Sequence, residues 1–215
     1  MNLLFRKLLI IGLWEVSSWV DGLKVELRFS SWREIFHAIL EIAKDIRCVF
    51  TPDVIVGVLR GGCIPAIILS DLLDVGEVDM MGVGYYVDIA QRKERPTLTR
   101  RLSTDVQGKA VLIVDDIADT GGTIRFVVEK LQKENPSDLK VSTVYCKPWA
   151  HPKPDFYYEE RSEWIIFPWE VKQTVKSVYN RFKGKNLDKV KSVLIEAGIE
   201  ERVVEEVWGL TEWKA

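Results

Sequence analysis

Hydrophobic positions along the chain fall into two recurring patterns, short continuous runs and longer segments with helical spacing. Continuous runs of strand length are typical of parallel strands that are buried on both faces. Strands are predicted at residues 54–59, 78–87, 110–114 and 141–146. Segments between them have apolar residues three and four positions apart and predict helices. Strand and helix in alternation predict an α/β fold with an open, mainly parallel twisted sheet flanked by helices.

The helical segments have recognisable beginnings. The predicted helices begin at Ser31, Ile64 and Thr123. Ser31 has capping-box spacing to Glu34, which places a helix N-terminus there. Residues 90–101 are polar, basic and interrupted by Pro96, so a mobile loop is expected in that part of the chain.

Both ends of the chain lie outside this alternating pattern. Residues 1–20 hold a short apolar stretch that Glu15 interrupts, and a membrane span needs about 20 apolar residues. The first interpretation is an extra strand or helix packed on the domain, the second is a later translation start, and membrane targeting ranks last. The expected division is an N-terminal extension (1–29), a main domain (30–170) and a helical C-terminal appendage (171–215).

Composition narrows the class of protein. The chain has 215 residues, of which 47% are hydrophobic, so it can bury a sizeable core. A formal net charge of -2 gives no reason to expect nucleic acid or an anionic membrane as a partner. The three cysteines are far apart and form no C-x-x-C pair, so neither a disulfide framework nor a structural zinc site is expected. This cysteine usage fits the reducing cytoplasm.

The densest cluster of polar chemistry follows the predicted strand at 110–114. Asp115-Asp116 stands where that strand is expected to end, and ligands of parallel sheets bind at the carboxyl ends of strands. Gly121-Gly122 opens the next helix, so backbone N–H groups and the helix dipole can hold a phosphate there. Thr120 and Thr123 add hydroxyl donors.

The two adjacent carboxylates suit vicinal sugar hydroxyls or a hydrated Mg²⁺ ion. The alternative is an ordinary capped loop, in which side chains only satisfy helix N–H groups. One cap needs one side chain, whereas this stretch holds three aspartates, two threonines and two glycines. It is not a Walker loop, because no Gly-Lys-Ser/Thr follows. A sugar phosphate is the ligand that the stretch predicts.

The run from Val111 to Thr123 resembles the phosphoribosyl pyrophosphate signature of the type I phosphoribosyltransferases. The resemblance implies that Asp115 and Asp116 bind the ribose hydroxyls and hold Mg²⁺ through water. The implied 5′-phosphate site consists of Asp119, Thr120, Gly121, Gly122 and Thr123. Asp119 is also the implied catalytic residue, a general base or acid at the purine N7.

A second stretch, Arg60-Gly61-Gly62, follows the predicted strand at 54–59, in the place of the family's pyrophosphate-binding loop. Glycines let backbone N–H groups approach an anion closely, and Arg60 adds positive charge. A common turn is the ordinary explanation for two glycines, but the order along the chain favours the functional one. Pyrophosphate binding is therefore assigned to Arg60, Gly61 and Gly62.

Lys147 bears on which base the protein uses. Its position at a strand end resembles that of the lysine in 6-oxopurine enzymes. An ammonium there can donate to the purine O6 carbonyl, whereas the amino group of adenine would face it as a second donor. The alternative is an ordinary solvated lysine.

Trp164 and Ile165 resemble part of the short hood, at about 150–170 here, of bacterial xanthine–guanine phosphoribosyltransferases. The resemblance implies that Trp164 stacks on the purine and that the Ile165 carbonyl accepts from the guanine 2-amino group. A core aromatic cluster is the alternative for Trp164, because burial is the usual fate of tryptophan.

Taken together, the resemblance implies a purine salvage enzyme. It would transfer 5-phosphoribosyl from phosphoribosyl pyrophosphate to guanine, hypoxanthine or xanthine with Mg²⁺, giving pyrophosphate and a nucleoside monophosphate. The alternatives are transfer to adenine, orotate or uracil, and a nucleotide-sensing regulator on the same fold. A cytoplasmic homo-oligomer, dimer or higher, without nucleic acid or membrane partners, is expected.

Overall fold

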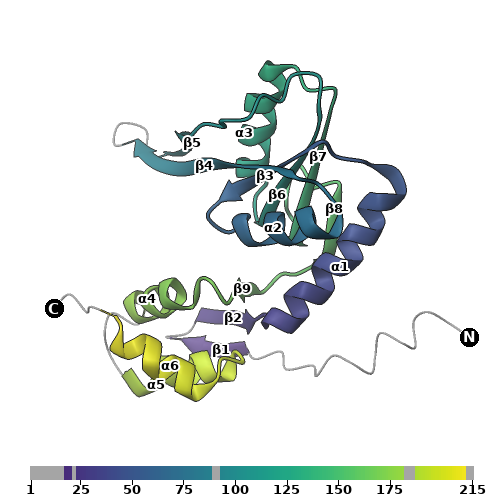
Figure 1. The fold of residues 1–215 in the computed structure, drawn as a ribbon. Helices are drawn as coiled ribbons and strands as arrows, with labels where there is room; N and C mark the ends of the chain where they lie inside the picture. The colour runs from purple at the N-terminus through teal and green to yellow at the C-terminus, as the bar shows by residue number, and fades with distance from the viewer. Residues whose placement is uncertain (1–16, 21–22, 89–92, 182–186, 212–215) are drawn as a thin grey trace, which may run out of the picture. The chain divides into compact units, whose positions relative to one another are not determined.

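The protein is described by a computed structural model that covers residues 17–20, 23–88, 93–181 and 187–211 (Figure 1). The chain divides into two compact units. Residues 32–162 form one of them, which we call the sheet unit. The described parts of 1–31 and 163–215 form the other, which we call the terminal unit because it joins segments from both ends of the chain.

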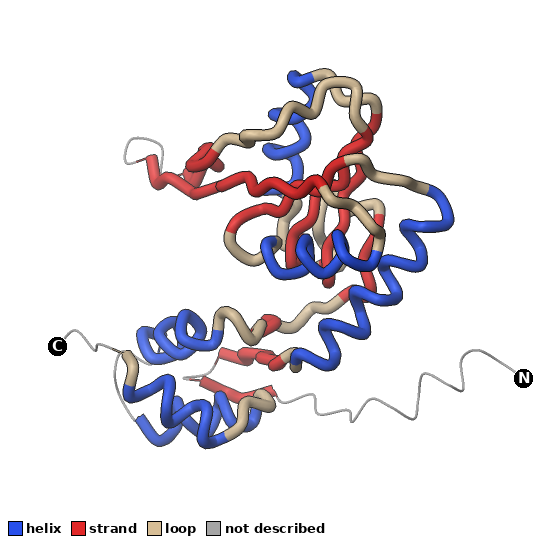
Figure 2. Tube along the Cα trace, viewed as in Figure 1, coloured by secondary structure: helices blue, strands red, loops and turns tan. Residues whose placement is uncertain are grey.

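Within the described residues, the sheet unit is built on a six-stranded sheet with the order β5-β4-β3-β6-β7-β8. Figure 2 shows the strands in red. All neighbouring strands run parallel except β5, which runs antiparallel to β4 at one edge. The strands are β3 (Val54–Leu59), β4 (Glu77–Asp88), β5 (Lys93–Arg100), β6 (Ala110–Ala118), β7 (Asp138–Cys146) and β8 (Phe156–Glu160). The expected open, mainly parallel sheet is confirmed.

Helices cover both faces of this sheet (Figure 1). On one face, α2 (Cys63–Leu72) packs so closely on β3 that a Cβ at Gly57 would lie 3.0 Å from the Ala66 Cβ, and α1 (Trp32–Val49) contacts α2. On the opposite face, α3 (Gly122–Leu131) packs against the alternate strand residues, and the 3₁₀ turn η1 (Gln132–Glu134) follows it. The buried cluster under α3 includes Val54, Val56, Val58, Ile124, Val127 and Leu131.

The prediction of a loop over residues 90–101 is wrong for its larger part, which is the edge strand β5. Its few apolar residues are compatible with a position at the edge of the sheet. Pro96, opposite Tyr85 of β4, is tolerated in this position, since an edge strand can lack one N–H without losing an internal ladder. Residues 89–92 lie outside the described part of the chain.

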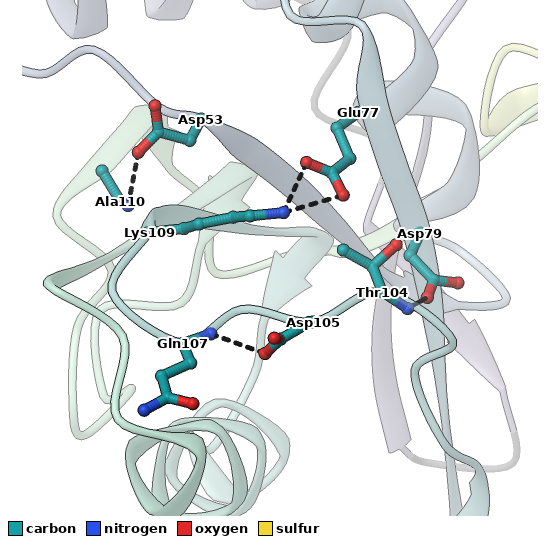
Figure 3. A network of polar contacts seen from close by, with 8 residues as sticks. All are labelled: Asp53, Glu77, Asp79, Thr104, Asp105, Gln107, Lys109 and Ala110. Atoms are coloured by element: carbon teal, nitrogen blue, oxygen red, sulfur yellow. Dashed lines mark hydrogen bonds and ion pairs between the residues drawn. The ribbon is translucent and has the colours of Figure 1, made fainter.

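Polar contacts tie together the amino ends of the central strands (Figure 3). Asp53, just before β3, accepts the Ala110 N–H at 2.8 Å and donates its own N–H to the Ala110 carbonyl at 2.8 Å. The Lys109 ammonium donates to both carboxylate oxygens of Glu77 at 2.9 and 2.8 Å. Because β3, β4 and β6 begin at or beside these residues, the contacts hold the three strands in register.

Asp79, a buried residue of β4, anchors the connection between β5 and β6. Its carboxylate accepts three backbone N–H groups, from Met80 (2.7 Å), Ser103 (2.5 Å) and Thr104 (2.9 Å; Figure 3). The Arg100 guanidinium lies 3.5 Å from its Oδ1. Burial alone would raise the pKa of this carboxyl, but the three N–H donors and the guanidinium outweigh burial and hold the pKa below its ordinary value.

The terminal unit has a three-stranded sheet, β1-β2-β9, among its described residues. Its strands are β1 (Ser17–Val20), β2 (Leu23–Phe29) and β9 (Trp164–Ile166), and its helices are α4 (Val171–Arg181), α5 (Leu187–Glu196) and α6 (Glu201–Gly209). β2 runs antiparallel to β1 and parallel to β9. Apolar residues of the three helices form one buried cluster with Leu27 and Ile166, so the helices close over the small sheet.

These units differ from the division into 1–29, 30–170 and 171–215 that the sequence suggested. Strand β2 pairs with β9, and the Phe29 N–H donates to the Ala197 carbonyl at 2.8 Å, so the extension, the hood strand and the C-terminal helices share one unit. Of residues 1–20, where an extra strand or helix was expected, the structure describes 17–20, which form β1, and residues 1–16 lie outside the described part. No helix among the described residues is long and apolar enough to cross a membrane.

Candidate active site

Asp115 and Asp116 lie inside β6, which continues to Ala118, and not after the strand as the apolar run predicted. The pairing of β6 explains the difference. β3 pairs with β6 only as far as Val114, whereas β7 pairs with it as far as Ala118. The final part of β6 thus continues beyond its pairing with β3 toward the carboxyl edge of the sheet, where ligands of parallel sheets bind. Both aspartates are buried, and the Asp116 N–H donates to Asp115 Oδ1 at 3.0 Å.

The loop Arg60-Gly61-Gly62, between β3 and α2, contacts this extension of β6. A Cβ at Gly61 would lie 1.7 Å from Asp116 Oδ2, so the loop backbone lies directly against the carboxylate. Arg60 is exposed, and its peptide bond with Leu59 is cis. The structure therefore brings together the loop assigned to pyrophosphate and the acidic pair assigned to ribose.

Gly62 supports the same loop in another way. Its N–H donates to the Val58 carbonyl at 2.9 Å, so this donor is already used within the turn. A Cβ at Gly62 would lie 2.3 Å from the Val114 carbonyl oxygen, which only glycine avoids. The second glycine is thus explained by close packing between the loop and β6.

Residues 117–124 line a pocket of about 320 Å³ at the beginning of α3. Gly121, the residue before α3, has a φ of 84° in the left-handed region that favours glycine. The Thr120 hydroxyl accepts the Gly122 N–H at 3.3 Å, a local contact of the kind expected for a capped loop. Asp119 instead bonds to a side chain of another segment, so capping does not account for the whole stretch. The pocket and the N-terminus of α3 can hold a phosphate.

Lys147 is not an ordinary solvated lysine, because only 6% of the residue is exposed. It follows β7, and its N–H donates to the Ala118 carbonyl at 2.8 Å, at the end of the neighbouring strand β6. Its ammonium donates to the Ser162 carbonyl at 3.3 Å. The structure therefore places this buried residue at the end of β7, beside the loop of residues 119–122.

Trp149 is a site residue that the sequence interpretation did not include. Its indole Nε1 donates to Asp119 Oδ1 at 3.3 Å, and the Lys147 Nζ lies 5.6 Å from its ring centroid. The His151 N–H donates to the Thr120 carbonyl at 3.1 Å, which joins the same segment to the loop of residues 119–122. An isolated tryptophan after Lys147-Pro148 gives no sequence signal of such a contact, because the contact depends on the pairing of β6 with β7.

Trp164 and Ile165 lie on β9 in the terminal unit, whereas the other candidate site residues lie in the sheet unit. The Trp164 residue is 61% exposed, so it is not part of an aromatic core, and Ile165 is buried. Trp169 is different, because its ring stacks on the buried Phe167 with centroids 4.9 Å apart.

The acidic pair offers two carboxylates to a metal ion. The described residues contain no group of three or more His, Cys, Asp or Glu side chains that could hold a metal. Mg²⁺ commonly binds through one or two carboxylates together with substrate phosphates and water. Asp115 and Asp116 therefore fit an Mg²⁺ ion that shares its coordination with a diphosphate substrate.

A parallel sheet with an acidic pair at its carboxyl edge and a pocket at the following helix N-terminus can accommodate a sugar phosphate. Comparison with known families makes this specific. Residues 28–200 match the phosphoribosyl transferase domain, and the chain belongs to this family. The expected family, fold class and enzyme class, a glycosyltransferase of the phosphoribosyltransferase type, are confirmed.

Individual relatives agree with this assignment. The xanthine-guanine phosphoribosyltransferase of Idiomarina loihiensis is 34% identical over 145 residues, which are 66% of this chain and 86% of the relative. A purine phosphoribosyltransferase from Pyrococcus horikoshii has 37% identity and a TM-score of 0.61 over 66% of this chain and 93% of its own. The xanthine-guanine-hypoxanthine phosphoribosyltransferase of Helicobacter pylori has 26% identity and a TM-score of 0.60 over 71% and 99%.

Proposed function

We propose that the protein transfers the 5-phosphoribosyl group of phosphoribosyl pyrophosphate to a 6-oxopurine, namely guanine, hypoxanthine or xanthine, in purine salvage. The observation that carries the proposal is the buried Lys147, whose backbone N–H is bonded to the end of β6 and whose ammonium donates to the Ser162 carbonyl. A hydrogen-bond donor there can bind the purine O6 carbonyl, whereas it would face a second donor in the amino group of adenine. The names of the relatives, which specify purine, xanthine and guanine, support the same class of base.

The sugar phosphate is assigned to the carboxyl end of β6 and the loop after it. Asp115 and Asp116 accept hydrogen bonds from the ribose hydroxyls. The 5′-phosphate is held by Asp119, Thr120, Gly121, Gly122 and Thr123. The pocket lined by residues 117–124 supports this assignment, because it opens at a helix N-terminus, where backbone N–H groups and the helix dipole favour an anion.

In the proposed reaction, the purine N9 forms a bond to the ribose C1′ while the bond from C1′ to the pyrophosphate oxygen breaks. The purine then carries an excess proton at N7, and the exposed carboxylate of Asp119 accepts it. Arg60, with the backbone of Gly61 and Gly62 holding its loop, stabilises the negative charge of the leaving pyrophosphate. Trp164 stacks on the purine, and the Ile165 carbonyl accepts from the 2-amino group of guanine.

The proposal includes Mg²⁺ as cofactor, which when bound supplies further charge neutralisation at the pyrophosphate. Asp115 and Asp116 would hold it through water. It also includes a cytoplasmic location and a homo-oligomer, without nucleic acid or membrane partners. Chelation should abolish turnover and added Mg²⁺ should restore it, and light scattering on the purified chain measures the oligomeric state.

The test is a substrate screen with phosphoribosyl pyrophosphate and Mg²⁺ present. Formation of the nucleoside monophosphate and release of pyrophosphate should occur with at least one of guanine, hypoxanthine and xanthine. Asp119→Asn should lower kcat by about 100-fold or more, since positioned acid–base groups contribute at least this much. Turnover with adenine, orotate or uracil alone would overturn the choice of base, and binding of nucleotides without any turnover would favour a regulator.

A further inference from the structure

Trp149 contacts both side chains that the proposed function assigns to one edge of the purine. The O6 and N7 atoms are neighbours on that edge, and the proposal gives O6 to Lys147 and N7 to Asp119. The Trp149 indole N–H donates to Asp119 Oδ1 at 3.3 Å, and the Lys147 ammonium lies 5.6 Å from the centre of the same ring. One exposed aromatic side chain therefore contacts both groups that are proposed to interact with adjacent purine atoms.

Hydrophobic burial does not account for Trp149, because 56% of the residue is exposed. Its backbone is nevertheless well anchored on both sides. The Lys147 N–H donates to the Ala118 carbonyl at 2.8 Å, and the His151 N–H donates to the Thr120 carbonyl at 3.1 Å. Ala118 and Thr120 flank Asp119, so the segment that carries the indole is fixed to the loop that carries the carboxylate.

Asp119 needs such a partner. It is exposed, and a carboxylate on a short side chain rotates easily because its terminal torsion is broad. A single N–H donor at Oδ1 restricts that rotation and directs the second oxygen. A general base must present its oxygen within hydrogen-bond reach of the proton that it accepts.

We propose that Trp149 is a positioning residue for the transfer reaction, which orients the Asp119 carboxylate toward the purine N7 and supports the Lys147 ammonium near O6. The inference rests on the proposed function. It adds a specific role for the indole N–H, which acts on the general base, and another for the ring face, which favours a nearby cation.

The two roles predict different kinetic effects. Trp149→Phe keeps an aromatic face but removes the N–H donor, so kcat with guanine should fall about tenfold while the KM for phosphoribosyl pyrophosphate stays unchanged. Trp149→Leu removes the ring as well, so the KM for guanine should rise in addition to the fall in kcat. A role in folding alone would not separate kcat from KM in this way.

A double-mutant cycle with Asp119→Asn gives the sharper test, because Trp149 is proposed to act through Asp119. In the Asp119→Asn background, Trp149→Phe should lower kcat no further. Trp32→Phe is the matched control, since Trp32 is 55% exposed and lies on α1, and it should leave turnover unchanged.

The possible outcomes distinguish a failure of the role proposed for Trp149 from a failure of the proposed function. An active wild-type enzyme with unchanged kcat in Trp149→Phe would overturn the role of Trp149 and leave the proposed function standing. A further fall in kcat when Trp149→Phe is added to Asp119→Asn would show that the indole does not act through the carboxylate, and it would also overturn the inference. A wild-type chain with no purine turnover would overturn both.

Discussion

The backbone of Gly61 lies so close to the Asp116 carboxylate that a Cβ at residue 61 would fall 1.7 Å from Oδ2. No side chain fits between the loop after β3 and the extension of β6. The loop proposed to hold pyrophosphate and the acid proposed to hold ribose therefore occupy adjoining positions, as the directly bonded pyrophosphate and ribose of one phosphoribosyl pyrophosphate molecule require.

Gly61→Ala should impair activity more than folding. The new methyl group meets a side-chain carboxylate, which can move away but then leaves its proposed position at the ribose. We expect a fall in kcat/KM for phosphoribosyl pyrophosphate of about tenfold, corresponding to about 1.4 kcal/mol, with a small change in Tm. Gly76→Ala is the control, because a Cβ at Gly76 meets no atom within 4 Å.

Gly62→Ala completes the comparison, because its methyl group would lie 2.3 Å from the Val114 carbonyl oxygen in β6. Backbone atoms of a central strand cannot move aside easily, so a loss of stability of about 1–3 kcal/mol is expected in urea unfolding. Equal effects of the Gly61 and Gly62 substitutions on both activity and stability would contradict this distinction.

Gly121→Ala should destabilise the loop of residues 119–122, where the 5′-phosphate is proposed to bind, for two reasons. The φ of 84° is unfavourable for alanine by about 1–2 kcal/mol. In addition, a Cβ would lie 2.4 Å from the carbonyl carbon and oxygen of His151. The KM for phosphoribosyl pyrophosphate should rise and the free energy of unfolding should fall.

Gly108→Ala separates these two causes. Gly108 has a φ of 69°, but a Cβ there meets nothing within 4 Å. It should therefore show only the backbone strain, with unchanged kinetics. If both variants lose the same stability in urea unfolding, the contact with His151 is not the additional cause.

Lys147→Met should reduce the affinity for the base and not for the sugar phosphate. Methionine retains a similar apolar length but cannot donate to the purine O6, so the KM for guanine should rise about tenfold or more. The KM for phosphoribosyl pyrophosphate should change little. Steady-state kinetics against both substrates measures the difference, and Lys133→Met, at an exposed position of η1, is the control. A rise in both KM values would indicate a general disturbance of the site.

Asp79 should make the sheet unit sensitive to acid. Its pKa in the folded protein is lower than the ordinary value of 3.8, so the ionised carboxylate stabilises the fold at neutral pH. This contribution is complete above the ordinary pKa and is lost as the pH falls through the lower folded value. Asp79→Asn should cost about 1–3 kcal/mol at about pH 7 and much less in strong acid.

Urea unfolding of wild type and Asp79→Asn across the acid range tests this dependence on pH. Asp105→Asn is the matched control, since Asp105 is exposed and accepts a single backbone N–H, from Gln107 at 2.9 Å (Figure 3). Its effect should stay within about 0.5 kcal/mol. A constant difference between wild type and Asp79→Asn at every pH would exclude the proposed cause.

The sheet unit could be predicted from the sequence because its signals are local. The apolar runs at 54–59 and 141–146 are strands of the sheet, β3 and the greater part of β7. The glycine pair before Thr123 opens α3 close to the predicted residue. In a parallel α/β unit, each strand is followed in sequence by the helix that covers it, so neighbouring residues largely decide the structure.

The remaining features depend on pairing with other strands, and the hydrophobic pattern of a single segment does not predict such pairing. Residues 93–100 form a strand because their backbone pairs with the edge of β4, and not because of their own hydrophobic pattern. The contact of Trp149 with Asp119 follows from a register in which Ala118 lies opposite Cys146. Sequence reasoning predicted a phosphate site at residues 119–123 but had no means of finding the indole that contacts Asp119.

The parallel pairing of β2 with β9 has a consequence for the order in which the molecule assembles. β2 leaves the ribosome early, yet its partner strand comes only after the whole of the sheet unit has been synthesised. Contacts between residues so far apart in sequence form late, because closing a long loop is entropically costly. We expect pulsed hydrogen exchange during refolding to show earlier protection in β6 than in β2. In a newly synthesised chain, the proposed sugar-phosphate site on β6 would then form before Trp164 and Ile165 are in place to bind a base.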